Sequence, residues 1–310
     1  MEAITKDGIV TPMVAMAISS ISCHLPFFSA ANMPMGMEVS STNTRVTRPS
    51  LADTGAPVAY MSANILSAYR TGAVPGVGYK HLSKPDSKVA AIIGPGVMSK
   101  TALAAIMAVR PGIETIKVKG RGKASLEKFI AHVKKEYPQV NVYAVDTMEE
   151  AVRDADIVSA STSTPTGDPS QYPYIKEEWI KPGALISSTA ALRFDDDFII
   201  HRARTVTDNI KLYEAWEEEM KPNAYNTVPI PAVHVMDLIA EGRMKPEQVD
   251  DLGDILMGNI PLHRKDDEII VYSIGGMPVE DVAWGTMVYR NALKKGIGTK
   301  LKLWDVPQMV

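Results

Sequence analysis

Cysteine is almost absent from this sequence: Cys23 is the only one in 310 residues. A secreted scaffold held together by disulfides is therefore excluded, and a reducing compartment is expected. Cys23 precedes His24, but adjacent residues on an extended chain point to opposite faces. We interpret the pair as a buried small residue beside a polar one, not as a nucleophile with its base. We expect no metal site.

The chain also lacks blocks of charge and long apolar runs. Lys and Arg number 33 against 36 Asp and Glu, so nothing resembles the clustered basic surface of a nucleic-acid-binding protein. The most apolar region, residues 8–31, is interrupted by Pro12, Pro26 and several serines, and it has no basic start typical of a signal peptide. We therefore expect a cytoplasmic protein with neither nucleic-acid nor membrane partners.

Length and hydrophobic content indicate more than one core. A chain of 310 residues that is 45% hydrophobic exceeds the size at which a single core usually divides, so two domains or a domain with an appended lobe are expected. Residues 1–60 are rich in Met, Ser and Pro and predict short extended segments joined by turns. Residues 62–82 predict a helix that leads, through a linker at 85–86, towards a new domain.

From residue 88 onwards, strand and helix patterns alternate with short connections. This alternation is typical of a parallel sheet covered by helices on both faces. The fold class predicted is α/β, with a Rossmann-type doubly wound parallel sheet. The strands expected are 88–93, 116–118, 140–145, 157–160, 184–187 and 268–273, and the helices 98–109, 125–136, 147–153, 209–220, 232–240, 249–257 and 279–294.

A Gly-Pro-Gly turn directly follows the first of these strands and opens a helix, which is the context that a dinucleotide-binding fingerprint requires. Gly94 would form the tight turn, and Gly96 would let the backbone approach a pyrophosphate. The negative charge of that group suits the free N–H groups of Val97 and Met98 at the positive end of the helix. Ser99 replaces the usual third glycine and is still small enough for close helix–sheet packing. We prefer cofactor binding to a purely structural turn.

The end of the second strand bears on which cofactor is bound. An NAD enzyme usually carries an acid there to hold the ribose 2′-hydroxyl, but in this chain no acid lies between the end of the strand and Glu127. Arg121, Lys123 and Ser125 instead supply the cationic and hydroxyl donors that a 2′-phosphate requires. The alternative is a solvated basic turn. NADP(H) is favoured and NAD(H) is the second choice.

Six segments with a fixed order and spacing carry a family resemblance. They are AYRTGA at 68–73, VAAIIGPG at 89–96, ADIVSAST at 155–162, WIKPGA at 179–184, DEIIV at 267–271 and GGMPVEDVA at 275–283. In this combination the chain resembles the ornithine cyclodeaminase/μ-crystallin family from about residue 53 to the C-terminus. The resemblance implies a homodimer, an NAD(P)-binding Rossmann domain at 86–278, and a discontinuous substrate-binding and dimerisation lobe at 1–82 and 279–310.

The chemistry that the resemblance implies is hydride transfer between a nicotinamide cofactor and the α-carbon of an amino or imino acid. Cyclodeamination of ornithine or a homologue is its most familiar form. One alternative is an NADPH-dependent ketimine or imino-acid reductase, or an amino-acid dehydrogenase. The other is a non-catalytic, crystallin-like NADP-binding protein.

The resemblance also suggests roles for individual residues. Arg70 matches the arginine that pairs with the substrate carboxylate, as a bidentate guanidinium would. Thr71 matches a neighbour that contacts the cofactor, and Ser161 and Thr162 match residues near the dinucleotide. Asp281 matches the family acid on the returning helix, where a catalytic role and a capping or supporting role both stay open.

Two departures from the family pattern concern the substrate. The family lysine that helps to hold the carboxylate falls near Glu38, which reverses the charge; Glu38 could attract a substrate amine or pair with a nearby arginine. Leu192 stands where ornithine cyclodeaminase has the aspartate that holds the distal amine, and the acids at 195–197 follow. Those acids could substitute for it, but we favour the start of a helix, where acids in the first turn are stabilising.

Overall fold

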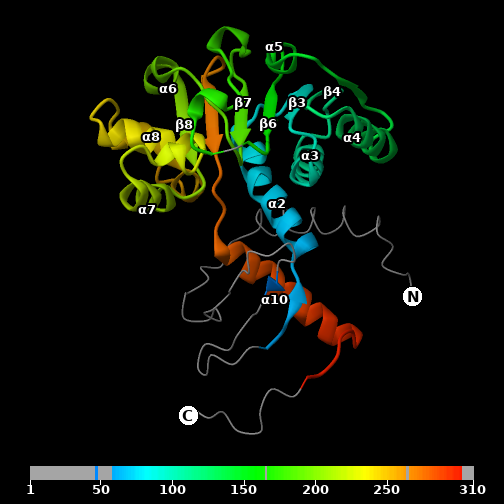
Figure 1. Cartoon of the computed structure of the whole chain (residues 1–310). Helices are drawn as coiled ribbons and strands as arrows, with labels where there is room; N and C mark the ends of the chain where they lie inside the picture. The colour runs from blue at the N-terminus through cyan, green and yellow to red at the C-terminus, as the bar shows by residue number, and fades with distance from the viewer. Residues whose placement is uncertain (1–45, 48–57, 165, 263–264, 302–310) are drawn as a thin grey trace, which may run out of the picture. The chain divides into compact units, whose positions relative to one another are not determined.

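The computed structural model describes residues 46–47, 58–164, 166–262 and 265–301 (Figure 1). Contacts divide the chain between Arg70 and Thr71 and again between Gly275 and Gly276. The segment Thr71–Gly275 forms the first unit, and the described residues of 20–70 and 276–310 belong to the second. Within the described ranges, no helix is both long and apolar enough to cross a membrane.

The first unit is built on an eight-stranded sheet with the order β5-β4-β3-β6-β7-β10-β8-β9 (Figure 1). Every pairing between its strands is parallel. The strands are β3 (Val89–Ile93), β4 (Thr115–Lys119), β5 (Asn141–Ala144), β6 (Ile157–Ala160), β7 (Leu185–Ser188), β8 (Ala203–Thr207), β9 (Val249–Asp251) and β10 (Ile269–Ser273). The predicted α/β fold with a parallel sheet is confirmed.

The order of the strands locates the edge of the sheet at which a ligand is expected. The chain runs outward from β3 to β4 and β5, then returns to β6 on the other side of β3. The strand order therefore reverses between β3 and β6. In open parallel sheets, ligands bind beyond the carboxyl ends of the strands at such a switch point.

Helices cover both faces of the sheet, and their inward-facing side chains are buried against the strands. They are α2 (Asn64–Leu82), α3 (Val97–Val109), α4 (Lys123–Glu136), α5 (Met148–Val152), α6 (Asp196–His201), α7 (Ile210–Met220), α8 (Pro231–Ala240) and α9 (Leu252–Met257). The second half of α2 packs on the face that presents Ser159 and Tyr272: the Tyr79 hydroxyl donates to Ser159 Oγ at 2.8 Å, and Gly78 leaves no room for a Cβ beside the Tyr272 ring.

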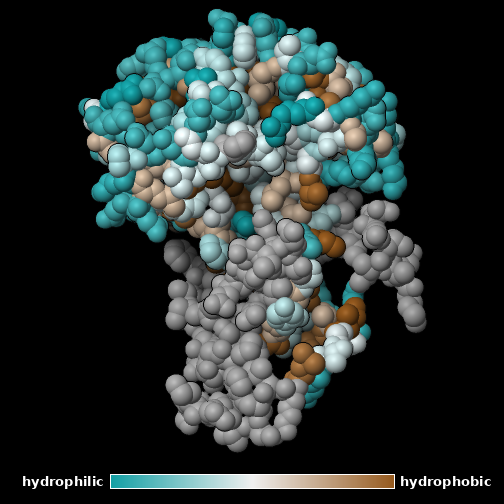
Figure 2. Space-filling model, in the orientation of Figure 1, coloured by the Kyte–Doolittle hydropathy of each residue, from teal (hydrophilic) through white to brown (hydrophobic). Residues whose placement is uncertain are grey.

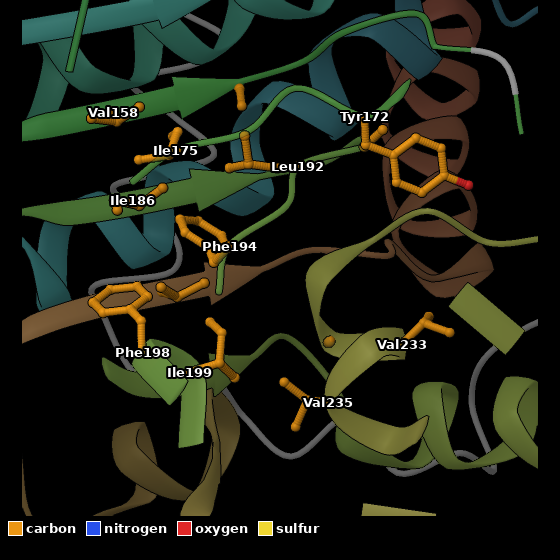
Figure 3. Close-up of a cluster of buried hydrophobic side chains, with 14 of the residues drawn as sticks. Val158, Tyr172, Ile175, Ile186, Leu192, Phe194, Phe198, Ile199, Val233 and Val235 are labelled. Carbon is orange, nitrogen blue, oxygen red and sulfur yellow. The ribbon is translucent and has the colours of Figure 1, made fainter. Parts of the chain in front are cut away.

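The other part of the core is a buried apolar cluster (Figure 3). It joins β6, β7 and β10 to the segment after β7 and to α6 and α8, because the strand residues alternate and the helices each present one apolar face. The side chains labelled there are Val158, Tyr172, Ile175, Ile186, Leu192, Phe194, Phe198, Ile199, Val233 and Val235. The outward faces of these helices carry mainly hydrophilic residues (Figure 2).

Two parts of the predicted secondary structure are wrong. The helix expected over 249–257 begins only at Leu252, because Asp251 caps it by accepting the Gly253 N–H at 2.8 Å, and the three residues before it pair with β8. Strand β8 itself is missing from the expected elements. Its second residue, Arg204, carries a charge that obscures the apolar pattern. Asp250 neutralises that charge through a contact of 2.6 Å.

The second unit contains the first turns of α2, the strands β1 (Val46–Thr47) and β2 (Met61–Ser62), and the helix α10 (Pro278–Lys295). The two strands pair antiparallel. The Tyr69 ring of α2 stacks on Trp284 of α10, with the ring centroids 6.4 Å apart. Helix α2 therefore contributes residues to both units. The extended segments predicted before residue 46 lie outside the described residues.

Candidate functional site

The turn between β3 and α3 requires glycine at one end only. Gly94 has φ +87°, and a Cβ there would lie 2.4 Å from the carbonyl oxygen of Ser161. Its N–H donates to the Lys119 carbonyl at 2.8 Å, so the turn is held against both neighbouring strands. At Gly96, by contrast, a Cβ would meet no atom within 4 Å. Gly94 is thus a packing glycine, whereas Gly96 borders open space.

The N-terminus of α3 faces that open space without a side-chain cap. Gly96 is its N-cap residue and makes no side-chain hydrogen bond, and Val97 in the first turn is 64% exposed. Ser99 is fully buried, and its hydroxyl donates to the Gly94 carbonyl, which fixes the turn. A pyrophosphate fits this place because it would meet free N–H groups, the positive end of a 13-residue helix and unfilled space over Gly96.

At the end of β4, the backbone leaves no room for an acidic side chain. A Cβ on Gly120 would lie 2.6 Å from Cδ of Pro95 in the glycine turn. The next residue, Arg121, is exposed, and its Nη2 donates to the Ser163 carbonyl at 2.6 Å. Since β4 and β6 lie on opposite sides of β3, this hydrogen bond connects the segments on either side of the glycine turn. Lys123 and Ser125 are exposed in the first turn of α4, which contains no acid.

Hydroxyl groups follow β6 and β7 at the same edge of the sheet. Ser161 Oγ and Thr189 Oγ1 share a hydrogen bond of 2.7 Å, and Thr162 Oγ1 donates to the Ala191 carbonyl at 3.2 Å. Ser161 and Thr162 are among the residues predicted from the sequence, whereas Thr189 is not. Its signal was its place directly after a buried strand that pairs with β6.

Thr71 has a buried hydroxyl that lacks a hydrogen-bond partner among the described residues. Its neighbour Gly72 packs against α3 so closely that a Cβ would lie 2.3 Å from Thr101 Oγ1. A buried hydroxyl without a partner costs free energy, which a ligand that supplies the partner would offset.

Arg70 lies in the second unit between two acids of α10. Its Nη1 is 3.4 Å from Glu280 Oε2, and its Nε is 3.1 Å from Asp281 Oδ1. The exposed fractions of the three side chains are only 18%, 16% and 10%. Gly276 has φ +75°, and a Cβ there would lie 2.4 Å from Arg70 Nη1. The structure therefore brings the predicted Arg70 and Asp281 together, and it places Glu280 and Gly276, which were not predicted from the sequence, beside them.

The segment after β7 supplies no free acid. Leu192 is fully buried, and the acids at 195–197 begin helix α6, so the interpretation as a helix start is confirmed. Burial disfavours the ionised form of Asp196, but hydrogen bonds from His234 and Arg243 outweigh this effect and lower its pKa. Asp195, Asp196 and Asp197 contact, respectively, Tyr174, His234 with Arg243, and Arg202.

Asp208, which follows β8, is a further acid at the carboxyl edge, and its contacts are structural. It accepts the Tyr213 hydroxyl at 2.6 Å and the Gly275 N–H at 3.0 Å. Burial and then the charge of Asp208 raise the pKa of Tyr213 well above its ordinary value, so Tyr213 stays a donor. The network holds the backbone at Gly275, just after the end of β10.

Glu38, a predicted site residue, lies outside the described residues, as do Cys23 and His24. In the described part of the chain, no three His, Cys, Asp or Glu side chains are grouped so that they could hold a metal ion.

Comparison with known proteins identifies relatives along most of the chain. The model of the Ornithine cyclodeaminase/mu-crystallin family matches residues 29–296. The N-((2S)-2-amino-2-carboxyethyl)-L-glutamate dehydrogenase of Staphylococcus aureus is 28% identical over 81% of this chain and 69% of its own. The Delta(1)-pyrroline-2-carboxylate reductase of Bacillus cereus is 24% identical over 96% and 85%.

Among solved structures, the Delta(1)-pyrroline-2-carboxylate reductase of Thermococcus litoralis, in complex with NADH and L-proline, is similar to this chain. It superposes with a TM-score of 0.69 at 26% identity, covering 83% of this chain and 74% of that one.

Proposed function

The chain belongs to the ornithine cyclodeaminase/mu-crystallin family, and we propose that it is an NAD(P)-dependent enzyme that moves hydride at the α-carbon of an amino or imino acid. The observation that carries the proposal is the β3–α3 turn, where Gly94 is packed tightly while Gly96 and the start of α3 face open space. The relatives named above are dehydrogenases and imine reductases, and one was solved with NADH.

The residues around the turn fit a nicotinamide dinucleotide. The N–H groups of Val97 and Met98 would hold its pyrophosphate, since the first N–H groups of a helix have no partner within the helix, and Gly94 and Gly96 would let the backbone approach it. The nicotinamide, when bound, supplies or accepts the hydride. The hydroxyls that follow β6 and β7, and that of Thr71, would orient the cofactor; they belong to Ser161, Thr162 and Thr189.

We infer a preference for NADP(H) from the end of β4. Pro95 leaves no space for a side chain at Gly120, so no acid can stand there to hold a ribose 2′-hydroxyl. Arg121, Lys123 and Ser125 offer a guanidinium, an ammonium and a hydroxyl instead. A phosphate is bound well by such donors, and a guanidinium can bind it through two hydrogen bonds.

Reduction of an imine, or its reversal, is favoured over cyclodeamination. A cyclodeaminase needs an acid for the distal amine of its substrate. Leu192 is buried here, and the three acids after it are engaged in contacts outside such a role. Arg70 would bind the substrate carboxylate, and Glu38 and Asp281 stay candidates for catalytic groups.

The same proposal assigns a function to each part of the chain. Residues 86–278 would bind the cofactor, and residues 1–82 and 279–310 would bind the substrate and form a homodimer. Helix α10 supports the dimer because it exposes apolar side chains, with Val279 at 42%, Met287 at 43% and Leu293 at 61% exposure.

The test is a fluorescence titration of the purified protein with NADPH and NADH, followed by assays with a panel of cyclic imines and L-amino acids that includes L-ornithine. NADPH bound more tightly, and oxidised on addition of an imine, is the expected result. Ammonia release from L-ornithine without net cofactor change would instead establish cyclodeamination. Tight cofactor binding without any turnover would indicate a non-catalytic protein, and binding of neither nucleotide would refute the proposal.

A further inference from the structure

Helix α2 approaches α3 so closely at Gly72 that only glycine fits there. A Cβ on Gly72 would lie 2.3 Å from Thr101 Oγ1 and 2.6 Å from the Thr101 carbonyl carbon. A different rotamer of Thr101 would not relieve this clash, because it involves the backbone as well. Glycine inside a helix is less favourable than alanine, since its backbone loses more conformational freedom on folding. The approach of the two helices therefore determines the residue at position 72.

At the other end of both helices, Arg110 forms a bridge between them. It is the C-cap residue of α3 and is only 8% exposed. Its Nη1 donates to the Val109 carbonyl of α3 at 2.8 Å. The rest of the guanidinium donates to carbonyls at the end of α2, at 2.8 Å to those of Lys80 and Ser83 and at 2.9 Å to that of Lys84. Carbonyls at the end of a helix have no partner within it, so a buried side chain of α3 supplies what the end of α2 lacks.

The contacts at Gly72 and Arg110 fix the register of α2 along α3. At about 1.5 Å per residue, Gly72 and Lys80 lie about 12 Å apart along the axis of α2. Thr101 and Arg110 lie about 14 Å apart along the axis of α3, so the spacings match and the helices run in the same direction. Thr71 directly precedes Gly72, and the first turn of α3 directly precedes Thr101. Thr71 is therefore level with the first turn of α3.

We propose that Gly72 and Arg110 are positioning residues for the cofactor. They hold α2 in the register that places the hydroxyl of Thr71, which is buried and lacks a partner among the described residues, at the level of the first turn of α3. The cofactor's pyrophosphate is proposed to bind at this turn, and its oxygens can accept the hydroxyl. Arg110 itself lies at the opposite end of α3 and acts only through α2. This inference rests on the proposed function, because it concerns the support of that cofactor site.

Thr71→Val tests the hydroxyl that the two residues position. The free protein should unfold at the same temperature or a higher one, because the variant removes a buried polar group that has no partner. Affinity for the preferred nucleotide, expected to be NADPH, should fall by about 10- to 100-fold, because a hydrogen bond to a charged oxygen is lost. Thr71→Ser keeps the hydroxyl and should stay within about threefold of the wild type. Thermal unfolding and fluorescence titration measure the two effects.

Arg110→Met tests the positioning through a double-mutant cycle. It should lower nucleotide affinity by about 3- to 10-fold in the wild-type background, but by less than about 1.5-fold in the Thr71→Val background, because Arg110 acts through Thr71. Gly72→Ala disturbs the other contact between the helices and should show the same dependence on Thr71. Arg110→Lys keeps donors near the carbonyls and should recover part of the lost affinity.

Two controls separate positioning from general destabilisation. Val133→Ala opens a cavity in α4, and Gly112→Ala places a Cβ at an ordinary contact distance, 3.8 Å from Lys88 Nζ. Both should keep nucleotide affinity within about 1.5-fold of the wild type.

Losses of affinity that add up in the double variants would overturn the proposal, since a merely structural defect acts whatever residue stands at position 71. Wild-type affinity in Thr71→Val would overturn it as well. If Arg110→Met does not fold, Arg110→Lys and Gly72→Ala provide the same cycle. Binding of neither nucleotide by the wild-type protein would refute the proposed function itself, which separates the two failures.

Discussion

The β3–α3 turn and the Arg70 cluster achieve specificity by different physical means. The turn is made of backbone: Gly94 fits because nothing larger fits against Ser161, and the start of α3 offers N–H groups. The Arg70 cluster is made of charged side chains that are 210 positions apart in the sequence. A steric site of the first kind follows from a short motif, whereas a site of the second kind forms only when distant segments pack. Substitutions should therefore affect stability at the turn and ligand selection at the cluster.

The largest effect is expected at Gly94. Gly94→Ala introduces a Cβ at 2.4 Å from a backbone carbonyl and a positive φ that alanine rarely adopts, and should lower the free energy of unfolding by about 2–5 kcal/mol. Gly96→Ala adds a Cβ into open space, so it should keep stability within about 0.5 kcal/mol and weaken nucleotide binding. Urea unfolding and fluorescence titration measure the two effects. Equal destabilisation by both changes would remove the distinction between the two glycines.

Arg70→Met tests the charged cluster. It removes the substrate's partner together with its contacts to Glu280 and Asp281, so kcat/KM should fall by about 100- to 1000-fold. Arg70→Lys keeps the charge but not the planar guanidinium, so its kcat/KM should lie between those of Arg70→Met and the wild type. Steady-state kinetics measure the loss, and nucleotide affinity should stay within about twofold in both variants. A comparable loss of nucleotide affinity would contradict separate roles.

Asp156 tests how much the hydrogen bonds at the start of β3 contribute to stability. Burial disfavours its ionised form, but hydrogen bonds from Lys181 and from the N–H groups of Lys88 and Val89 outweigh this effect and lower its pKa. A pKa lower in the folded state means that the stabilisation is present above the ordinary pKa of an aspartate, about 4, and disappears as the pH falls through the folded value.

Asp156→Asn should consequently lower the free energy of unfolding at pH 7 by about 1–3 kcal/mol, and by less in acid. Thermal or urea unfolding between pH 7 and pH 3 measures this convergence of the variant with the wild type. A difference between them that stays constant over this range would exclude the ionised form of Asp156 as its source.

Arg121→Ser tests the choice of cofactor at the edge of the turn. Loss of the guanidinium should lower the affinity for NADPH by about tenfold and change the affinity for NADH by less than about twofold, because only NADPH has a 2′-phosphate. Lys128→Ser removes an exposed cation further along α4 and serves as control. Parallel weakening of both nucleotides would indicate that Arg121 supports the loop after β6 through Ser163 and does not select the cofactor.

The smallest effect is expected from Asp195→Asn. Asp195 begins α6 and accepts the Tyr174 hydroxyl at 2.6 Å, so its loss should change stability by about 1 kcal/mol or less and kcat/KM by less than about twofold. Kinetics with the best substrate measure it. A loss of activity above tenfold would return an acid of this segment to the catalytic site.

How far the sequence leads differs from element to element. Strand β6 is buried throughout, with Ser159 as its only polar residue, and is followed by Ser161 and Thr162, so both its position and its polar end are predictable. Strand β8 carries Arg204, whose partners Asp250 in β9 and Glu268 just before β10 are distant in the sequence, so its pattern becomes intelligible only in the sheet. Glu280 is likewise an ordinary acid in the first turn of a helix until Arg70 stands beside it.

By itself, the sequence determined the parallel α/β sheet and the location of the glycine turn, because apolar periodicity and the conformational freedom of glycine act over a few residues. It also placed the acids at 195–197 at a helix start. Only the tertiary structure decided that Arg70 lies between two acids against Gly276, that Pro95 excludes an acid at Gly120, and that Leu192 is buried. Each of these depends on distant segments meeting at atomic distances, and steric exclusion and charge pairing act only at that range.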